Sequence, residues 1–338
     1  MTEKNEGYPE VTLLILNYNG MEYIEECLDS VLKTDYPRCK VIVIDNASND
    51  GSSEFVEENY PQVKLFKNHE NYGFAKAYND ALKYVESDLV LFLNNDVLVE
   101  PNWLKNIASY MVNDKSISAI NPKILLMQNK NVINAAGGNC DLFGVGWNRG
   151  NGEIDKGQYE NVEEVFYANG AAMLIRKDVW KDVGPFDEQY FLYGEDLDWC
   201  WRARLKGYKI LYVPTSKIYH KWRASKGQII RLLEKHWLAT LLKNYSLKNI
   251  FVIMPKFLAL KILKALWLFK NGKDSNEKLA VFDSFLWNLV IFKKTWEKRL
   301  LIQASRKISD KELQKHMYNG SFELLLGFGR MRHPLVGK

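Results

Sequence analysis

The sequence predicts an α/β fold with a mostly parallel central sheet that helices flank on both faces. Over the first 125 residues, short apolar runs alternate with segments of helical periodicity, which is the pattern of repeated β-α units. The apolar runs are nearly continuous, and such runs are typical of strands that are buried on both faces. A chain of 338 residues, 47% hydrophobic and 26% charged, has enough apolar residues for this domain and a second region.

The predicted elements follow one another closely in the first part of the chain. Each strand is an apolar run such as VTLLIL, and each helix spaces its apolar residues as in MEYIEECLDSVL. Strands are expected at 11–16, 40–45, 63–66 and 89–93, and helices at 21–32, 52–59 and 74–85.

The middle of the chain continues this pattern less regularly. Residues 128–164 are rich in Gly, Asn and charge and have weak periodicity, so we expect long loops or a hairpin near the binding site. A strand should run directly into a helix over 170–180. A helix over 194–207 should end at its glycine, and a strand over 208–214 should be stopped by its proline.

The C-terminal region, 227–338, differs in charge from the rest of the chain. Residues 1–220 hold 22 basic and 33 acidic residues, a net charge of −11, whereas residues 221–338 hold 24 and 8, a net charge of +16. A basic region on an acidic body indicates an anionic partner, either a membrane surface or a nucleic acid. The high apolar content of this region favours lipid, and we expect no nucleic-acid partner.

Three apolar helical segments are expected in this region, at 229–245, 249–272 and 280–302, with a turn at 271–276. None has about 18 uninterrupted apolar residues, so none is predicted to span a membrane. Basic residues beside Trp, Phe and Leu instead indicate helices that lie in an anionic membrane interface over residues 249–300. The lysines expected to extend their stems toward water are Lys256, Lys261, Lys264 and Lys270. The alternative is a helical subdomain that packs on the core.

The cysteines and the N-terminus indicate the compartment. Cys27, Cys39, Cys140 and Cys200 are scattered, without a CxxC pair, which argues against a zinc ribbon or a disulfide scaffold and fits a reducing compartment. The polar, acidic start MTEKNEGYPE does not resemble a signal peptide. A cytoplasmic location is therefore expected.

Polar residues follow three of the predicted strands at the point where each strand ends. Ligands of such sheets bind beyond the carboxyl ends of the strands, so these residues are candidates for a binding site. They fit either turns or a nucleotide site, because Asn, Asp and Ser are good turn formers. The residues are Asn17, Tyr18, Asn19, Asp45, Asn46, Ser48, Asp50, Asn94, Asn95 and Asp96.

A second nucleotide-binding signal is the stretch Asn71-Tyr72-Gly73, which opens the helix predicted at 74–85. The N–H groups at the start of a helix favour an anion, so this stretch is a candidate phosphate contact.

A divalent cation is expected beside the nucleotide diphosphate. Asp96 can be a ligand of Mg²⁺ or Mn²⁺, which proteins hold with few side-chain oxygens when phosphates supply others. Asn94 and Asn95 are neutral and suit hydrogen bonds to a ribose. One carboxylate leaves the ion weakly held, so another ligand is needed and His220 is the candidate. The alternative for His220 is an ordinary core or surface residue.

The stretch GEDLDW is the strongest signal for catalysis. Glu195, Asp196 and Asp198 crowd the predicted start of a helix, behind several aromatic residues. Helix capping explains one or two acids at such a position, but not three beside so many aromatic side chains. Helical spacing places Glu195, Asp198, Trp199 and Arg202 on one face and Asp196 on another. One carboxylate could act as a general base with a raised pKa while Arg202 holds another.

Seven stretches of the chain, read in order, resemble glycosyltransferase family 2, whose members are inverting enzymes of the GT-A fold, and especially its rhamnosyltransferase-like branch. They span residues 10–222 and are VTLLILNYNG, VIVIDNASNDGS, NHENYGFAKAYN, LFLNNDV, NGAAMLIRKDVW, GPFDEQYFLYGEDLDWCWRARLKGYKI and IYH. The resemblance implies a Rossmann-like GT-A catalytic domain over 1–226, with nucleotide-sugar binding in 10–125 and the acceptor and catalytic part in 126–226.

The resemblance also implies roles for individual residues. Asp96 would be the metal-binding acid of an Asp-x-Asp element in which Asn94 replaces an acid, and His220 would complete the metal site. Asp196 would be the catalytic base, with Glu195 as the alternative. The nucleotide would contact Asn17, Tyr18, Asn19, Asp45, Asn46, Ser48, Asn71, Gly73, Asn94 and Asn95. The donor sugar and the acceptor would contact Asn169, Gly170, Asp198, Trp199 and Arg202.

The implied function is transfer of a sugar from a nucleotide-diphosphate sugar to a hydroxyl of a glycan, on a polyprenyl-lipid-linked acceptor at the inner face of the cell membrane. Rhamnosyl transfer from dTDP-rhamnose is the leading expectation. One alternative is a sugar-nucleotide nucleotidyltransferase, but such enzymes usually carry a glycine-rich basic loop where this chain has LNYNGMEY. Another is a non-catalytic nucleotide-sugar or glycan-binding protein. A dehydrogenase is disfavoured because no GxGxxG follows the first strand.

Overall fold

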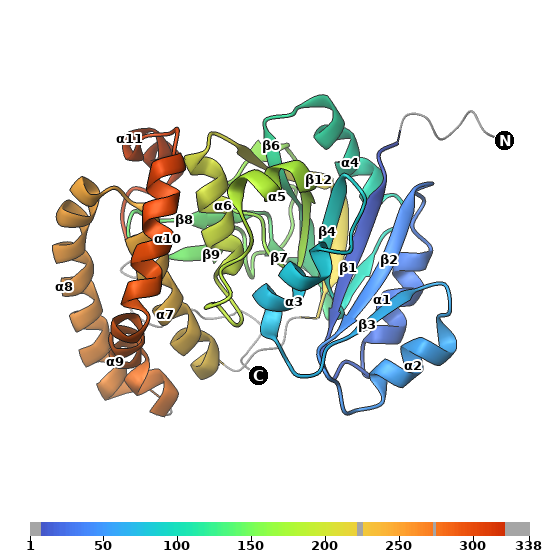
Figure 1. Ribbon diagram of the computed structural model, residues 1–338, viewed down its shortest axis with the longest axis horizontal. Coiled ribbons are helices and arrows are strands. Elements are labelled where there is room, and N and C mark those ends of the chain that lie inside the picture. Colours follow the sequence, from blue (N-terminus) through green and yellow to red (C-terminus); the bar gives the residue numbers. More distant parts are fainter. Residues whose placement is uncertain (1–7, 222–225, 273–274, 322–338) are drawn as a thin grey trace.

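A computed structural model of the chain describes residues 8–221, 226–272 and 275–321 (Figure 1). A twisted sheet with helices on its faces forms one part of the molecule. The C-terminal helices α7 to α10 stand side by side at one end of that sheet, next to α6 (Figure 1).

The predicted α/β fold is confirmed, and the central sheet is mixed but mostly parallel. Its order is β10-β12-β6-β11-β4-β1-β2-β3, with β5 paired to β12 and β7 paired to β6, while β8 and β9 form a separate hairpin. β11 runs antiparallel to both of its neighbours, β4 and β6. The strands are β1 (Val11–Asn17), β2 (Cys39–Asp45), β3 (Lys64–Lys67), β4 (Leu89–Asn94), β5 (Val97–Val99), β6 (Ile117–Leu126), β7 (Asn129–Ala135), β8 (Gly138–Cys140), β9 (Gly146–Asn148), β10 (Glu163–Glu164), β11 (Ala172–Arg176) and β12 (Lys209–His220).

The helices agree with the predicted positions to within a few residues in most cases. They are α1 (Ile24–Leu32), α2 (Ser52–Asn59), α3 (Gly73–Leu82), α4 (Trp103–Asn113), α5 (Lys177–Val183), α6 (Glu195–Leu205), α7 (Lys226–Asn244), α8 (Leu247–Asn271), α9 (Ser275–Val290), α10 (Phe292–Ser305) and α11 (Asp310–Leu313), followed by the 3₁₀ turn η1 (Gln314–His316).

The core fills both faces of the sheet because successive side chains of a strand point to opposite faces. In β4, Val90 and Phe92 pack into one apolar cluster, whereas Leu89, Leu91 and Leu93 pack into the other. Every one of these side chains is buried, which explains why the strand sequences are continuous apolar runs.

Two predicted boundaries are wrong. The strand expected to stop at Pro214 continues to His220, because Pro214 lies where the register between β12 and β6 shifts, so its missing N–H interrupts no regular ladder. The helical segment expected over 280–302 is two helices that are separated at Ile291. The turn expected at 271–276 lies between α8 and α9 but includes residues 273–274, which are outside the described part of the chain.

The segment 128–164 contains both of the features that were expected. It forms β7, the hairpin of β8 and β9, and the short β10, joined by irregular loops.

The buried side of α8 contains charged as well as apolar side chains. Lys261 and Lys264 of α8 are buried and form ion pairs with Glu234 of α7 at 2.9 and 2.6 Å. The prediction that these two lysines extend toward water is therefore wrong, because their ammonium groups point at a buried carboxylate. Lys256 and Lys270 are exposed.

The inward side of α9 and α10 is polar as well. Ser284 and Asn288 donate to main-chain oxygens of α7 at 2.7 and 3.0 Å, and Arg299 donates to the carbonyl of Tyr245 at 2.6 Å. Large apolar side chains are exposed instead, namely Phe251, Val252, Ile262, Leu263, Leu266 and Phe269 of α8, Leu279, Phe282, Leu286, Leu289 and Val290 of α9, and Phe292, Leu300 and Leu301 of α10. Among the described residues, no helix has the length and apolar character that crossing a bilayer requires.

Candidate active site

The carboxyl ends of β1, β2 and β4 meet at one edge of the sheet. The parallel register aligns Asn17 of β1 with Asp45 of β2, and Leu16 with Asn94 of β4. Asn17 donates to Asp45 Oδ1 at 2.9 Å and accepts a hydrogen bond from Asn95 Nδ2 at 2.7 Å. The polar residues that were predicted from the strand ends therefore form one connected group.

Asn17 holds this group together from within. Its side chain is fully buried, and its amide also donates to the hydroxyls of Ser48 and Ser52 at 3.2 and 2.9 Å. Both polar atoms of the Asn17 amide therefore bind protein, and its contact to a nucleotide stays a prediction. Asp45 and Asn46 are also buried, and their contacts to a nucleoside stay predictions.

The loops above these strands present several residues to solvent. Tyr18 and Asn19 are exposed, and Ser48 is half-buried. The Asn19 N–H donates to Ser48 Oγ at 2.9 Å, and Asn19 Oδ1 accepts from the Asn49 N–H at the same distance. Asn19 has φ +49°, and Asn tolerates this left-handed conformation better than most residues. This loop offers an accessible polar rim for a nucleoside.

The N–H groups at the start of α3 donate to protein oxygens and do not face solvent. The Gly73 N–H donates to Asn71 Oδ1 at 2.9 Å, and the Phe74 N–H donates to the carbonyl of Phe191 at 2.7 Å. A Cβ at Gly73 would lie 2.3 Å from that same carbonyl oxygen, and φ there is +69°, so this position requires glycine. These two N–H groups already have protein acceptors, and the phosphate contact stays a prediction. The contacts instead join the nucleotide side of the edge to the segment before α6.

The acidic pair at the start of α6 contains one accessible and one buried carboxylate. Asp196 is half-buried, and its Oδ2 accepts from the Gly170 N–H at 2.9 Å. Glu195 is 3% exposed, and its Oε2 has no hydrogen-bond partner within the described residues. Of the two side chains, Asp196 is the less buried.

Burial shifts the acid–base equilibria of both side chains in the same direction. It raises the pKa of the Asp196 carboxyl above its ordinary value, although backbone N–H groups partly offset the shift. Burial, and then the nearby charge of Asp196, raise the pKa of Glu195 well above its ordinary value. A carboxylate with a raised pKa is a better proton acceptor near neutral pH.

Asp196 lies beside the Asn-Asn-Asp stretch that follows β4. The Asn94 N–H donates to the carbonyl of Ala171 at 3.1 Å, and the preceding residue Gly170 donates to Asp196. The carboxylate of Asp96 is also close enough to Tyr193, just before α6, to raise the pKa of its phenol further after burial has raised it. The acid of α6 and the acid after β4 therefore belong to the same edge.

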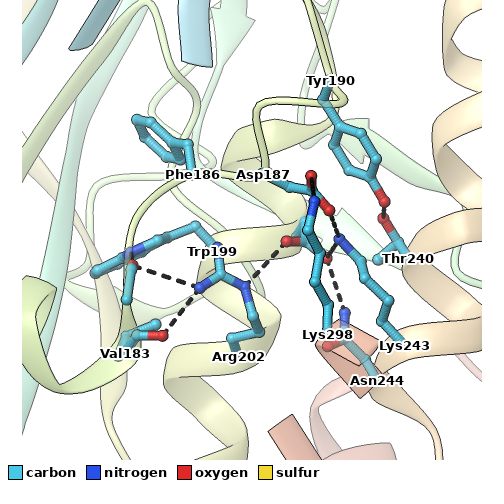
Figure 2. A network of polar contacts seen from close by, with 12 residues as sticks. Val183, Phe186, Asp187, Tyr190, Trp199, Arg202, Thr240, Lys243, Asn244 and Lys298 are labelled. Atoms are coloured by element: carbon cyan, nitrogen blue, oxygen red, sulfur yellow. Dashed lines mark hydrogen bonds and ion pairs between the residues drawn. The ribbon is translucent and has the colours of Figure 1, made fainter. Parts of the chain in front are cut away.

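Three residues that were predicted to contact sugars bind other protein atoms in this structure. Asp198, Trp199 and Arg202 are buried on the side of α6 that faces the core. Arg202 Nε donates to Asp198 Oδ2 at 3.0 Å, as the spacing predicted (Figure 2). The indole of Trp199 stacks on Trp180 with ring centroids 5.4 Å apart. Protein atoms surround these three side chains in this structure, and their contacts to sugars stay predictions.

Asn169 and Gly170 lie where an acceptor could approach the base. Asn169 is half-buried and donates to Asn148 Oδ1 of β9 at 2.9 Å, which places the 138–148 hairpin next to the site, as predicted. A Cβ at Gly170 would lie 3.0 Å from the Phe74 ring and 3.6 Å from Asp196 Oδ2. The small residue thus allows α6 and α3 to approach each other.

Asp96 and His220 can hold a divalent cation together. His220 pairs with Val97 across β12 and β5, which brings its Nε2 within 3.3 Å of Asp96 Oδ1. Its Nδ1 lies 2.9 Å from Asn134 Oδ1, so with Nδ1 as the donor, Nε2 presents a lone pair to the carboxylate. Two acceptors that face each other need a proton or a cation between them. The facing oxygen of Asp96 and nitrogen of His220 therefore fit Mg²⁺ or Mn²⁺ as ligands.

This pair would supply only part of the ligands of a metal ion. Within the described residues, no group of three or more His, Cys, Asp or Glu side chains gathers around one point. Two protein ligands are typical of a cation whose remaining ligands are phosphate oxygens and water.

Several residues near the site were missed in the sequence. Asn134 and Asn148 lie in the segment of weak periodicity and showed no usable signal. His236, Thr240 and Lys243 lie on α7 and contact the segment before α6. Their spacing of four and three residues places them on one face of α7, and this signal could have found them.

Comparison with known proteins shows which family the chain resembles. Residues 9–237 match the family described as glycosyltransferase like family 2. The glycosyltransferase AglE of Haloferax volcanii is 25% identical over 265 residues, covering 72% of this chain and 79% of the relative. The N-acetylglucosaminyl-diphospho-decaprenol L-rhamnosyltransferase of Mycobacterium tuberculosis is 27% identical over 241 residues, covering 64% and 77%.

Solved structures show the same fold. S. aureus TarS 1–349 in complex with UDP-GlcNAc has a TM-score of 0.56 and 18% identity, covering 91% of this chain and 89% of that one. The mannosyltransferase PcManGT of Pyrobaculum calidifontis, in complex with GDP-Man and Mn²⁺, has a TM-score of 0.53 and 18% identity, covering 89% and 87%. At these identities the likeness shows the GT-A fold alone.

Proposed function

Because the chain belongs to glycosyltransferase like family 2 and is a glycosyltransferase, we propose that it moves a sugar, with inversion, from a nucleotide-diphosphate sugar to a hydroxyl of a lipid-linked glycan. The observation that carries this proposal is the position of Asp196, an accessible carboxylate with a raised pKa at the same sheet edge as Asp96 and His220. Family membership sets aside the nucleotidyltransferase and the non-catalytic binding protein.

The residues of the chain divide the reaction between them. Asp196 accepts the proton of the acceptor hydroxyl as its oxygen attacks the anomeric carbon from the face opposite the diphosphate. The bond from that carbon to the diphosphate oxygen breaks, and the nucleoside diphosphate leaves. One displacement inverts the anomeric centre, which suits a site whose other nearby acid, Glu195, is buried.

Asp96 and His220 would hold a divalent cation next to the donor diphosphate. When bound, such a cation neutralises the negative charge that develops on the leaving group. Asn94 and Asn95 are half-buried beside these residues and can donate to the ribose or the phosphates. The exposed Tyr18 and Asn19 would line the nucleoside.

We take dTDP-rhamnose as the donor and a polyprenyl-diphosphate glycan as the acceptor. One relative is named for L-rhamnosyl transfer to N-acetylglucosaminyl-diphospho-decaprenol, and this name supports the choice of both substrates. Residues 1–226 would carry the catalysis, and residues 227–338 would bring the enzyme to the cytoplasmic face of the membrane where such an acceptor lies.

The exposed apolar face of α8 to α10 supports this membrane contact. Exposed large apolar side chains lie along all three helices, and exposed lysines accompany them, among them Lys248, Lys256, Lys270, Lys293 and Lys294. Apolar side chains with basic neighbours fit the interface of an anionic bilayer, where each Lys near the surface adds about 1 kcal/mol.

A donor screen tests the proposed reaction. The protein is incubated with UDP-, GDP- and dTDP-sugars, each with Mn²⁺ and a synthetic polyprenyl-diphosphate N-acetylglucosamine, and release of the nucleoside diphosphate is followed. We expect release that depends on the acceptor and is fastest with dTDP-rhamnose. Faster release with another sugar would correct the donor, and no acceptor-dependent release with any donor would contradict the proposal.

A further inference from the structure

The turn that carries the proposed base has an unusual backbone conformation. Tyr193 and Gly194, directly before Glu195 and Asp196, have φ +68° and +90°. A tyrosine with positive φ is uncommon, and such residues persist where the surrounding structure holds them. The position of Asp196 depends on this turn, because Asp196 lies in the first turn of α6.

His236 of α7 contacts this turn from the side of the C-terminal helices. Its Nδ1 lies 2.5 Å from the carbonyl oxygen of Tyr193, so the imidazole donates its N–H to that oxygen. Its ring stacks on Tyr190 with centroids 4.4 Å apart and planes 12° apart. A Cβ at Gly194 would lie 3.2 Å from His236 Cβ, so the histidine also packs closely against Gly194.

The imidazole is fixed in one state. It is 2% exposed, and burial lowers its pKa to about 4. At neutral pH it is therefore uncharged, and the hydrogen bond to Tyr193 selects the tautomer with the proton on Nδ1.

Other contacts hold α7 in place independently of His236. Thr240 Oγ1 lies 2.9 Å from the hydroxyl of Tyr190, and Lys243 forms ion pairs with Asp187 and Asp198 (Figure 2). Asn244 donates to Asp198 at 3.1 Å. Loss of the His236 hydrogen bond should therefore leave α7 docked and change only the turn.

We propose that His236 is a positioning residue that fixes the turn at Tyr193 and Gly194 and thereby holds Asp196 in reach of the acceptor hydroxyl. This proposal rests on the proposed function, in which Asp196 is the base. The hydrogen bond sets the orientation of the Tyr193 peptide group, and that orientation sets the direction in which α6 begins. The proposed donor contacts lie at the ends of β1 and β4, outside this turn.

Three variants test the role of His236. His236→Leu removes the N–H but retains similar volume, whereas His236→Asn places an amide N–H near the position of Nδ1. His316→Leu is the matched control, since His316 is a partly exposed histidine of η1. We expect His236→Leu to lower kcat by about 10²-fold with the donor KM changed less than about threefold, because a misplaced reacting group affects the chemical step. His236→Asn should recover most of kcat, and His316→Leu should match the wild type.

Two outcomes would overturn this role for His236. One is a kcat for His236→Leu equal to that of the wild type. The other is a similar loss of kcat in His236→Leu and His236→Asn together with a raised donor KM, because this combination indicates general loss of structure. A crystal structure of His236→Leu separates this proposal from the proposed function, because it needs no activity. Retention of the Asp196 contact to the Gly170 N–H at 2.9 Å would contradict the positioning role even if no sugar transfer is found.

Discussion

The Lys243 ammonium group lies 3.0 Å from the Asp198 carboxylate, and the two side chains are only 1% and 0% exposed. This ion pair joins α7 to α6, the helix that begins with Glu195 and Asp196. Asp187 accepts from both Lys243 and Lys298, and this extends the network to α10 (Figure 2). The C-terminal helices α7 and α10 are therefore joined by ion pairs to α6 and to the segment before it.

Lys243→Met should strongly destabilise the protein. The substitution removes the cation that the buried carboxylates of Asp187 and Asp198 share. Lys298 and Arg202 remain as partners, so the loss should approach but not exceed the roughly 3–5 kcal/mol that an uncompensated buried charge costs. Urea unfolding gives the free energy of unfolding. Lys298→Met is the control, because Lys298 is partly exposed and should cost about 1 kcal/mol or less. Equal losses in the two variants would contradict the assignment of Lys243 as the central cation.

Asp196→Asn should lower kcat by at least about 10²-fold, because it removes the proton acceptor and keeps the shape. Donor affinity, measured by calorimetry, should remain within about twofold of the wild type. Glu195→Gln is the matched control and should affect kcat much less, because the Glu195 side chain is buried and burial raises its pKa well above the ordinary value. A larger loss in the Glu195 variant would move the base to that residue.

The pH dependence of turnover follows from the raised pKa of Asp196. The base must be deprotonated to act, so kcat should fall as pH falls through the pKa of Asp196, and this limb should lie above the ordinary value of 3.8. Rates at saturating donor and acceptor between pH 4 and 8, with salt held constant, would show the limb. Turnover that stays constant down to pH 4 would contradict a raised pKa for the base.

Glu195→Gln should change the pH dependence of stability with a definite sign. The folded state raises the pKa of Glu195, so the wild type loses stability as pH rises through that pKa, because a buried carboxyl must then ionise. Glutamine does not titrate. The melting temperature of the variant minus that of the wild type should therefore increase between pH 5 and pH 9. A difference that is constant with pH would show that Glu195 has an ordinary pKa.

The parts of the site that follow strand ends were predictable from the sequence. Apolar runs followed by Asn, Ser or Asp located Asn17, Asp45 and Asn94 correctly, because parallel strands place their carboxyl ends at one edge. The pattern did not predict which of these side chains are exposed to solvent. Asn17 has the same residue type and position as an accessible ligand, yet its amide is used entirely to connect three loops.

The parts that depend on contacts between distant segments were not predictable. Helical spacing placed Asp198 and Arg202 on one face of α6 correctly. Every residue of α6 except Asp196 is buried, however, and spacing alone could not identify the less buried side chain. Lys261 and Lys264 have the spacing of surface lysines, and only the tertiary fold brings Glu234 of α7 to them.

Chelation and substitution should separate the metal site from the rest of the nucleotide site. His220→Ala and Asp96→Ala each remove one of the two facing groups, so each should abolish the gain in nucleoside-diphosphate affinity that Mn²⁺ gives. EDTA should do the same to the wild type. Calorimetry with UDP, GDP and dTDP, with and without Mn²⁺, measures this gain, and Asn134→Ala should reduce it less because Asn134 only orients His220. Full activity in EDTA would defeat the metal assignment.

Membrane binding should depend on the exposed apolar side chains of α8 and not on its buried lysines. Leu266 and Phe269 are 65% and 73% exposed, so Leu266→Ser with Phe269→Ser should leave the fold intact. In flotation with vesicles that contain anionic lipid, this double variant should lose most of its binding, because burial of such side chains drives interfacial association. Ile154→Ser is the control, since Ile154 is 59% exposed but lies in the loop after β9. Binding by the double variant equal to that of the control would favour a second copy of the chain as the occupant of this face, and sedimentation of the wild type would then show a dimer that the double variant lacks.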